Sequence, residues 1–196
     1  ILRWLLPLME GFDVSSLSEL HTLLKNGVSP GRITFSGPGK TNEALEAALH
    51  NKIQVIHIDS LCEYEFLKVR NKLQDTTLRI TPLQQQAALM SLKLGLNKEE
   101  LDSVLRQRHS SPFLGLHMYL GRESFTTQSL QDSLLAISEI YGHHPESFIE
   151  NPRIYLGPGL PANLSALVDE LTIKPLPPHP DRKSTRLNSS HSDRSR

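Results

Sequence analysis

The sequence has little cysteine and no long apolar segment. Its 196 residues include one cysteine, Cys62, which excludes a disulfide framework within the chain and suits a reducing compartment. The longest mostly apolar stretch, Ile1 to Met9, is interrupted by Arg3 and Pro7 and is too short to cross a bilayer. It also lacks the basic start and the small-residue cleavage site of a signal peptide. We therefore expect a cytoplasmic protein without a membrane partner.

An excess of charge of one sign is also absent. Lysine plus arginine and aspartate plus glutamate each number 21, which argues against a strongly basic nucleic-acid-binding module. The balance hides an asymmetry, because residues 181–196 contain five basic and two acidic residues and so carry +3, which leaves −3 on the first 180 residues. Hydrophobic residues make up 38% of the chain, enough to bury a core.

The last 16 residues differ in character from the rest. The stretch from Asp181 to His191 resembles one reading frame of a common sequencing adapter, and the other interpretation is a basic, serine-rich disordered terminus. We exclude residues 181–196 from the expected fold. An adapter origin would mean that the natural chain continues beyond Pro180, and Ile1, which is not a start methionine, indicates a missing beginning.

Short apolar runs alternate with helical patterns along the chain. The runs are rich in β-branched and aromatic residues, as buried strands are. Six strand–helix units in succession predict an α/β fold with a parallel sheet, either a barrel or a doubly wound sheet. The predicted strands are Gly11–Ser15, Ile33–Ser36, Gln54–Asp59, Thr77–Thr81, Leu114–Leu120 and Ile154–Leu156. The predicted helices begin at or after Ser16 (to Gly27), Asn42, Ser60 (to Lys72), Asn97, Thr126 (to Tyr141) and Asn163 (to Leu171).

Polar residues and glycines stand where the predicted strands end. In parallel α/β folds these ends lie at one edge, where active sites are found. A carboxylate, a guanidinium group, aromatic rings and glycines at one rim suit a flat anionic ligand. The other interpretation is the ordinary polarity of loops at strand ends. The residues are Asp13, Ser36, Gly37, Asp59, Ser60, Arg79, His117, Tyr119, Gly157 and Gly159.

Three other motifs have simpler explanations. The loop from Gly37 to Thr41 (GPGKT) lacks the first glycine of a phosphate-binding loop, because Thr34 stands there, so we interpret it as a strand-to-helix turn. The adjacent residues His143 and His144 do not suit a metal site, and we expect a polar loop after a helix. Cys62 falls in a helical segment, where we expect a small core side chain rather than a nucleophile.

Seven segments in chain order resemble the barrel of the fold-type III pyridoxal-phosphate enzymes, in particular the ornithine/diaminopimelate/arginine decarboxylase group. Together they cover about residues 10–162, and their order is more specific than any one of them. The resemblance implies a partial (β/α)8 TIM-type barrel, alanine-racemase-like, with about six of the eight units. The segments are Gly11–Leu20 (GFDVSSLSEL), Phe35–Lys40, Ile58–Glu63, Leu78–Pro82 (LRITP), Lys93–Gly95, Gly115–Gly121 (GLHMYLG) and Leu156–Pro161 (LGPGLP).

The resemblance also implies residues that bind the cofactor, pyridoxal 5′-phosphate. Arg79 would lie beneath or beside its ring, and Tyr119 aligns with a histidine that stacks on that ring in the family. Gly157 and Gly159 would bring backbone N–H groups to the phosphate. Arg122 stands where a phosphate-binding serine is common, and it would serve as a cationic anchor.

The lysine that joins the cofactor in the family lies on the first barrel strand, and no such strand precedes Ile1. Asp13 and Glu19 would lie near that lysine and orient it. Lys25 and Lys40 do not replace it, since Lys25 falls on a helix and Lys40 matches a different lysine of the family. We therefore assign no catalytic residue beyond these two supporting carboxylates, and no metal.

These observations predict one incomplete domain. We expect a pyridoxal-phosphate-binding barrel over residues 1–174, a proline-rich end at 175–180 and a disordered tail at 181–196. The intact protein would be a homodimeric decarboxylase of a basic or diamino acid, and the 196-residue chain itself would be inactive. Tyr119 and Pro158 depart from the commonest family pattern, which leaves open a racemase or a siderophore-pathway decarboxylase. A non-catalytic, decarboxylase-like binding protein is the remaining alternative.

Overall fold

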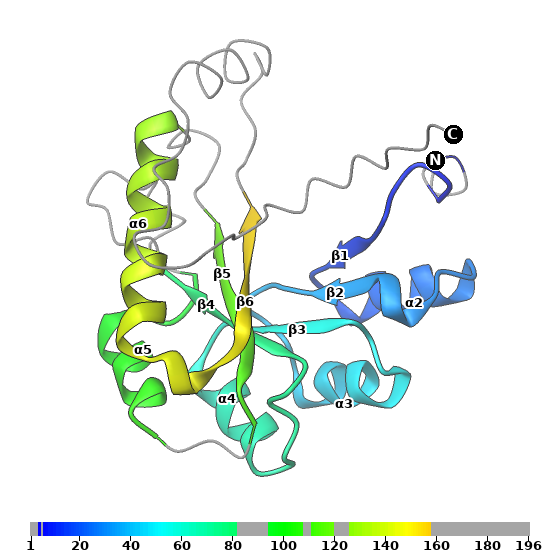
Figure 1. Ribbon diagram of the computed structural model, residues 1–196. Coiled ribbons are helices and arrows are strands. Elements are labelled where there is room, and N and C mark those ends of the chain that lie inside the picture. The colour runs from blue at the N-terminus through cyan, green and yellow to red at the C-terminus, as the bar shows by residue number, and fades with distance from the viewer. Residues whose placement is uncertain (1–3, 5, 82–93, 108–110, 120–125, 158–196) are drawn as a thin grey trace.

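The computed structural model describes residues 4, 6–81, 94–107, 111–119 and 126–157, which form a parallel sheet with helices between its strands (Figure 1). Six strands were predicted and the described residues form six; the first five lie within a few residues of their expected places, and the sixth begins earlier than expected. The strands are β1 (Phe12–Val14), β2 (Ile33–Phe35), β3 (Val55–Ile58), β4 (Thr76–Ile80), β5 (Phe113–Tyr119) and β6 (Phe148–Gly157). The helices are α2 (Leu17–Lys25), α3 (Asn42–Asn51), α4 (Leu61–Lys68), α5 (Lys98–Leu105) and α6 (Thr127–His143), with single 3₁₀ turns at Pro30–Arg32 and Pro145–Ser147.

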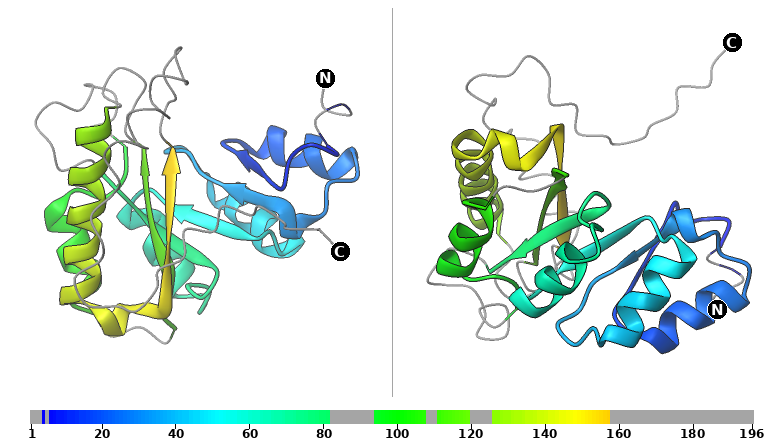
Figure 2. Two further views of the ribbon diagram at one scale, coloured as in Figure 1. Left: turned by 45° about the horizontal axis from the view of Figure 1, so that its top comes forward. Right: turned by 90° about the horizontal axis from the view of Figure 1, so that it is seen from below.

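The order of the strands decides between the two predicted architectures. All six are parallel, and their order in the sheet, β1-β2-β3-β4-β5-β6, is their order in the chain. A doubly wound sheet reverses direction at a switch point, whereas a barrel advances steadily. The described helices lie along one side of the curved sheet in both views of Figure 2. The fold is therefore a partial (β/α) barrel.

The two faces of the sheet differ in polarity because side chains alternate along each strand. The core that packs beneath the helices includes Phe35, Leu78 and Leu116 from the strands, all fully buried. The helices contribute the equally buried Leu20 and Tyr64. The alternate strand positions carry mostly polar side chains, so the strands place polar groups on the face away from the helices.

Side-chain caps fix the starts of the helices, as the sequence predicted. Ser16, Thr41, Ser60, Asn97 and Thr126 each accept a hydrogen bond from the backbone N–H three residues further on. In α2 and α4, the glutamate three residues after the cap bonds to the residue that precedes the cap. The Glu19 carboxylate in α2 accepts a hydrogen bond from the backbone N–H of Ser15 (2.7 Å). The Glu63 carboxylate in α4 accepts one from the backbone N–H of Asp59 (2.8 Å). These two bonds tie the ends of β1 and β3 to the helices that follow.

Three details differ from the sequence-based expectations. Helix α4 ends at Lys68 rather than at Lys72, because Asn71 adopts a left-handed conformation (φ 54°) that a helix excludes. Cys62 is exposed, so the expectation of a core side chain was wrong; Glu63, Tyr64 and Leu67 form the buried side of α4 instead. The helix expected at 163–171 lies outside the described residues. Among the described helices, none has the length and apolar character needed to span a membrane.

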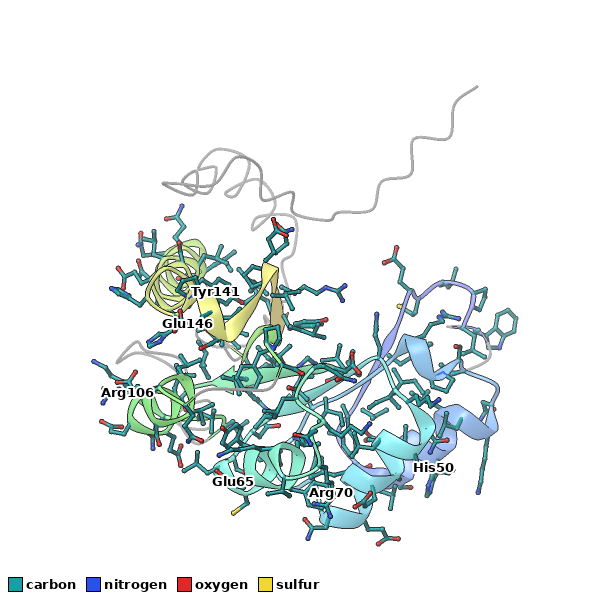
Figure 3. The ribbon with its side chains drawn as sticks, turned by 60° about the horizontal axis from the view of Figure 1, so that its bottom comes forward. His50, Glu65, Arg70, Arg106, Tyr141 and Glu146 are labelled. Atoms are coloured by element: carbon teal, nitrogen blue, oxygen red, sulfur yellow. The ribbon has the colours of Figure 1, made fainter. Side chains whose placement is uncertain are left out.

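Strand β6 begins at Phe148, well before the predicted Ile154, and its register with β5 shifts beside Gly115. Pro152 hides this early part of the strand from a pattern search, since proline is rare inside a paired strand. At the shift, the Tyr141 hydroxyl accepts from the backbone N–H of Leu116 (2.9 Å) and donates to the carbonyl of Arg153 (2.7 Å). Figure 3 shows Tyr141 between α6 and β6. The helix thus satisfies backbone groups that the irregular ladder leaves free.

We expect Gly115→Ala to destabilise the fold, because a Cβ at Gly115 would lie 1.9 Å from the carbonyl oxygen of Arg153 on β6. The free energy of unfolding in urea should fall by about 1–3 kcal/mol. Gly142→Ala is the matched control, since nothing lies within 4 Å of a Cβ at that position in α6. It should raise the stability by up to about 1 kcal/mol through helix propensity. Equal stability of the two variants would contradict the close packing of β5 against β6.

Candidate functional site

A buried ionic cluster lies where β2, β3 and β4 end, and it consists of Lys40, Asp59, Glu63 and Arg79. The Lys40 ammonium lies 2.5 Å from one Asp59 carboxylate oxygen and 3.0 Å from the Glu63 carboxylate. The other Asp59 oxygen accepts from Arg79 Nη1 at 2.7 Å. The four side chains are between 0% and 6% exposed, so their interactions are shielded from water.

Mutual neutralisation makes this burial possible. An unpaired buried charge is strongly unfavourable, but two cations here face two carboxylates. Lys40 also donates to the carbonyl of Gly37 (2.7 Å), so each of its three N–H groups has an acceptor. Burial raises the pKa of Glu63, and the Lys40 charge and the bond from the Asp59 amide offset part of that rise. Ion pairs of this cluster therefore join four segments: the loop before α3, the end of β3, α4 and β4.

Two buried histidine rings lie on the same polar face. His57 in β3 and His117 in β5 have ring centroids 4.3 Å apart, and the centroid of the Tyr155 ring in β6 lies 4.9 Å from that of His57 in an edge-to-face arrangement. His57 Nδ1 is 2.6 Å from the hydroxyl of Thr77. Burial, the largest cause, acts together with neighbouring positive groups to lower the pKa of His57 to about 2 and that of His117 to about 4. Both rings are therefore neutral at pH 7.

Two nitrogen atoms on this face have no hydrogen-bond partner among the described residues, although both are fully buried. They are Arg79 Nε and His117 Nδ1. Arg79 and His117 are direct partners across β4 and β5, so the two atoms belong to neighbouring side chains. Buried polar groups are nearly always paired in native proteins. The pair therefore indicates a place where a polar ligand would complete the structure.

The structure brings three of the predicted cofactor-binding residues together. The guanidinium carbon of Arg79 lies 6.0 Å from the centroid of the Tyr119 ring. Gly157 pairs with Tyr119 across β5 and β6, and a Cβ at Gly157 would lie 2.7 Å from the ring of Tyr119. This glycine therefore makes room for the tyrosine. Arg122 and Gly159 lie outside the described residues.

The two supporting carboxylates occupy different surroundings. Asp13 at the end of β1 accepts from the hydroxyls of Ser36 (2.5 Å) and Thr34 (2.7 Å). Its carboxylate keeps contact with solvent, but desolvation by the surrounding protein raises its pKa and the two hydroxyl bonds offset part of that rise. Glu19 lies in the first turn of α2, where it binds Ser15. No contact between Asp13 and Glu19 is present in the described part of the chain.

The ionic cluster and the histidine pair were not recognised as units from the sequence. Asp59 and His117 were noted as residues at strand ends, and Asp59, His117 and Lys40 stand in family-like segments, but neither the ion pairs nor the ring contact was predicted. The sequence does contain a pattern that points to this polar face. Pairs of polar residues two positions apart occur in three strands: His57 and Asp59, Thr77 and Arg79, and His117 and Tyr119. Residues two apart on a strand share a face. Three neighbouring strands therefore place polar pairs on one side of the sheet.

Residues 1–166 match the sequence model of the pyridoxal binding domain of pyridoxal-dependent decarboxylases. The chain belongs to this decarboxylase family. Its site residues lie at the carboxyl ends of the barrel strands, where active sites of (β/α) barrels are found. The family uses pyridoxal phosphate as its cofactor.

Two curated relatives in this decarboxylase family are similar over most of the chain. An L-glutamyl-[acyl-carrier protein] decarboxylase from Niallia circulans is 30% identical over 138 residues, which cover 63% of this chain and 32% of the relative. A diaminopimelate decarboxylase from Staphylococcus aureus is 30% identical over 158 residues, which cover 74% of this chain and 33% of the relative. The chain spans about a third of the length of these two relatives. The structure of a diaminopimelate decarboxylase from M. jannaschii in complex with L-lysine has the same fold, with a TM-score of 0.67 at 21% identity. The similar region covers 88% of this chain and 46% of that structure's chain.

The buried histidines predict an acid-sensitive fold. Below pH 6.5, the ordinary histidine pKa, His57 and His117 are protonated in the unfolded chain but stay neutral in the folded chain. The free energy of unfolding should therefore fall between pH 6.5 and pH 5, by up to about 1.4 kcal/mol per pH unit for each ring. Urea denaturation across this range measures the slope. His57→Gln and His117→Gln should each flatten it, and His21→Gln on the exposed side of α2 controls for the substitution itself. A slope unchanged by both buried variants would contradict this assignment.

Proposed function

We propose that this chain is the cofactor-binding part of a pyridoxal-phosphate-dependent decarboxylase acting on a basic or diamino acid. The observation that carries the proposal is the pair of buried nitrogens of Arg79 and His117, which have no hydrogen-bond partner among the described residues and lie near the ring of Tyr119. The relation to a diaminopimelate decarboxylase supports the substrate class.

The described residues fit pyridoxal phosphate. The cofactor is flat and carries oxygen atoms, and the site offers buried donors beside an aromatic ring at one strand rim. Arg79 and Tyr119 would hold the ring, and Gly157 would leave space beside Tyr119. Gly159 and Arg122 would bind the phosphate. We propose residues 1–174 as this domain, with 175–180 and the tail at 181–196 outside it, and a homodimer for the full-length protein.

When bound, pyridoxal phosphate would supply an electron sink for the carbanion left by loss of CO₂ from the substrate. The chain's own residues would orient and shield it. Arg79 donates hydrogen bonds from a side chain whose charge is already balanced by Asp59. The buried His57 and His117 stay neutral, so they add no further positive charge beneath Arg79. The site thus offers donors of fixed direction in a dry environment, where hydrogen bonds are strongest.

No described lysine is placed to join the cofactor, and we propose that the 196-residue chain alone has no turnover. The ammonium of Lys40 is buried and fully occupied by Gly37, Asp59 and Glu63. Lys25 is exposed in the last turn of α2. Both observations support the expectation that neither Lys40 nor Lys25 replaces the family's lysine.

Binding of pyridoxal phosphate tests the cofactor assignment. Equilibrium dialysis should show saturable binding to the chain, and Tyr119→Ala should weaken it about tenfold because the ring loses its stacking surface. Tyr119→Phe is the matched control and should keep the affinity within about twofold, since the ring remains. Unchanged affinity of Tyr119→Ala would overturn the role of this ring. Absence of any saturable binding by the parent chain would favour the cofactor-free, decarboxylase-like binding protein.

Turnover tests the proposed inactivity. The purified chain, supplied with pyridoxal phosphate, should release no CO₂ from ornithine, arginine, lysine or diaminopimelate above the rate with free cofactor. Borohydride reduction followed by peptide mass spectrometry should find no stoichiometric cofactor adduct on any one lysine. Sustained CO₂ release together with a specific adduct on Lys40 or Lys25 would show that this chain carries its own catalytic lysine.

A further inference from the structure

Asp59 is the one member of the ionic cluster that contacts both cations. Its Oδ1 accepts from Arg79 Nη1 at 2.7 Å, and its Oδ2 lies 2.5 Å from Lys40 Nζ. Glu63 contacts Lys40 and the backbone N–H of Asp59. The structure shows no bond between Glu63 and Arg79 within the described residues. Both carboxylates therefore contact Lys40, but only Asp59 contacts Arg79.

The backbone holds Asp59 and Arg79 at the same level of the sheet. Ile58 pairs with Leu78 across β3 and β4, so the residues that follow them, Asp59 and Arg79, are lateral neighbours. The guanidinium group is planar, with its donors in a rigid fork. Once Nη1 is fixed on Asp59, the direction of Nε follows from the plane of the group. Nε is the buried atom that has no partner among the described residues.

We propose that Asp59 is a positioning residue that orients Arg79 so that Nε is presented to the cofactor. The inference rests on the proposed function, and it assigns a separate task to a residue that touches neither cofactor nor substrate. Lys40 serves the same arrangement, because it holds the second oxygen of Asp59 and so prevents rotation of the carboxylate. A charge-balancing role alone would be met by any nearby carboxylate, whereas positioning requires this one.

Asp59→Asn and Glu63→Gln form a matched pair of variants. Each removes one negative charge beside Lys40, but only the first removes the partner of Arg79. Equilibrium dialysis should show that Asp59→Asn weakens pyridoxal phosphate binding about tenfold, the effect of losing one oriented charge-assisted hydrogen bond. Both variants should lower the urea midpoint of unfolding by similar amounts. Glu63→Gln should nevertheless keep the affinity for pyridoxal phosphate within about twofold of the parent chain. Equal loss of affinity in both variants would overturn the proposal.

A second readout does not depend on the cofactor. The ¹⁵N spectrum of the arginine side chains should contain a narrow, slowly exchanging Nε–H signal for Arg79, identified by its loss in Arg79→Lys. The signal should persist in Glu63→Gln and broaden or disappear in Asp59→Asn. If the parent chain does not bind pyridoxal phosphate, the proposed function fails, and this signal still decides whether Asp59 orients Arg79. Persistence of the signal in Asp59→Asn would contradict the positioning role.

Asp59→Glu covers the case in which Asp59→Asn does not fold. It keeps the charge balance of the cluster and moves the carboxylate by one methylene. Positioning predicts that this variant folds but binds pyridoxal phosphate about tenfold more weakly, since the guanidinium plane shifts. Affinity equal to that of the parent chain would show that only the charge matters, and it would overturn the proposal.

Discussion

A single buried carboxylate, Asp59, connects the elements that form the rim of this sheet. It binds a lysine from the loop after β2 and an arginine from β4, and its own backbone N–H is held by a glutamate from α4. None of these ions can be buried alone, because an unpaired charge in a dry interior is strongly destabilising. The relative placement of four segments thus follows from charge neutrality, and the direction of the Arg79 donors follows from that placement.

The polarity of the sheet face explains why such a cluster is present. The helices cover one face with a continuous apolar core, as in other parallel α/β folds. The opposite face carries a row of hydroxyl, imidazole and charged side chains in place of the branched apolar residues that fill many barrels. A face of this kind is stable only if its polar groups are satisfied, and two of its nitrogens are not satisfied within the described residues. Under the proposed function, bound pyridoxal phosphate would pair with these two nitrogens.

Much of the architecture was predictable from local patterns. Caps such as Ser16 and Ser60 marked the helix starts, and short β-branched runs marked the strands, because both signals depend on neighbouring residues. Strand order was not predictable, since a barrel and a doubly wound sheet share the same local units. Pro152 concealed the start of β6. Arg79 and Tyr119 were found through family motifs. Asp59, Lys40 and Glu63 also stand in such motifs, but their ion pairs form only when three segments distant in sequence meet in a dry interior.

The most direct test of this account is a titration of the ¹⁵N-labelled chain with pyridoxal phosphate, followed through the side-chain signals of Arg79 and His117. The account predicts saturable shifts of Arg79 Nε and His117 Nδ1 at one common ligand concentration, because both atoms are buried on neighbouring strands and have no partner in the described part of the chain. The Nε signal of Arg70, which lies in the turn after α4 and bonds to Glu46, should not move. Shifts spread evenly over all arginines, or none at Arg79 and His117, would contradict a cofactor site at this rim.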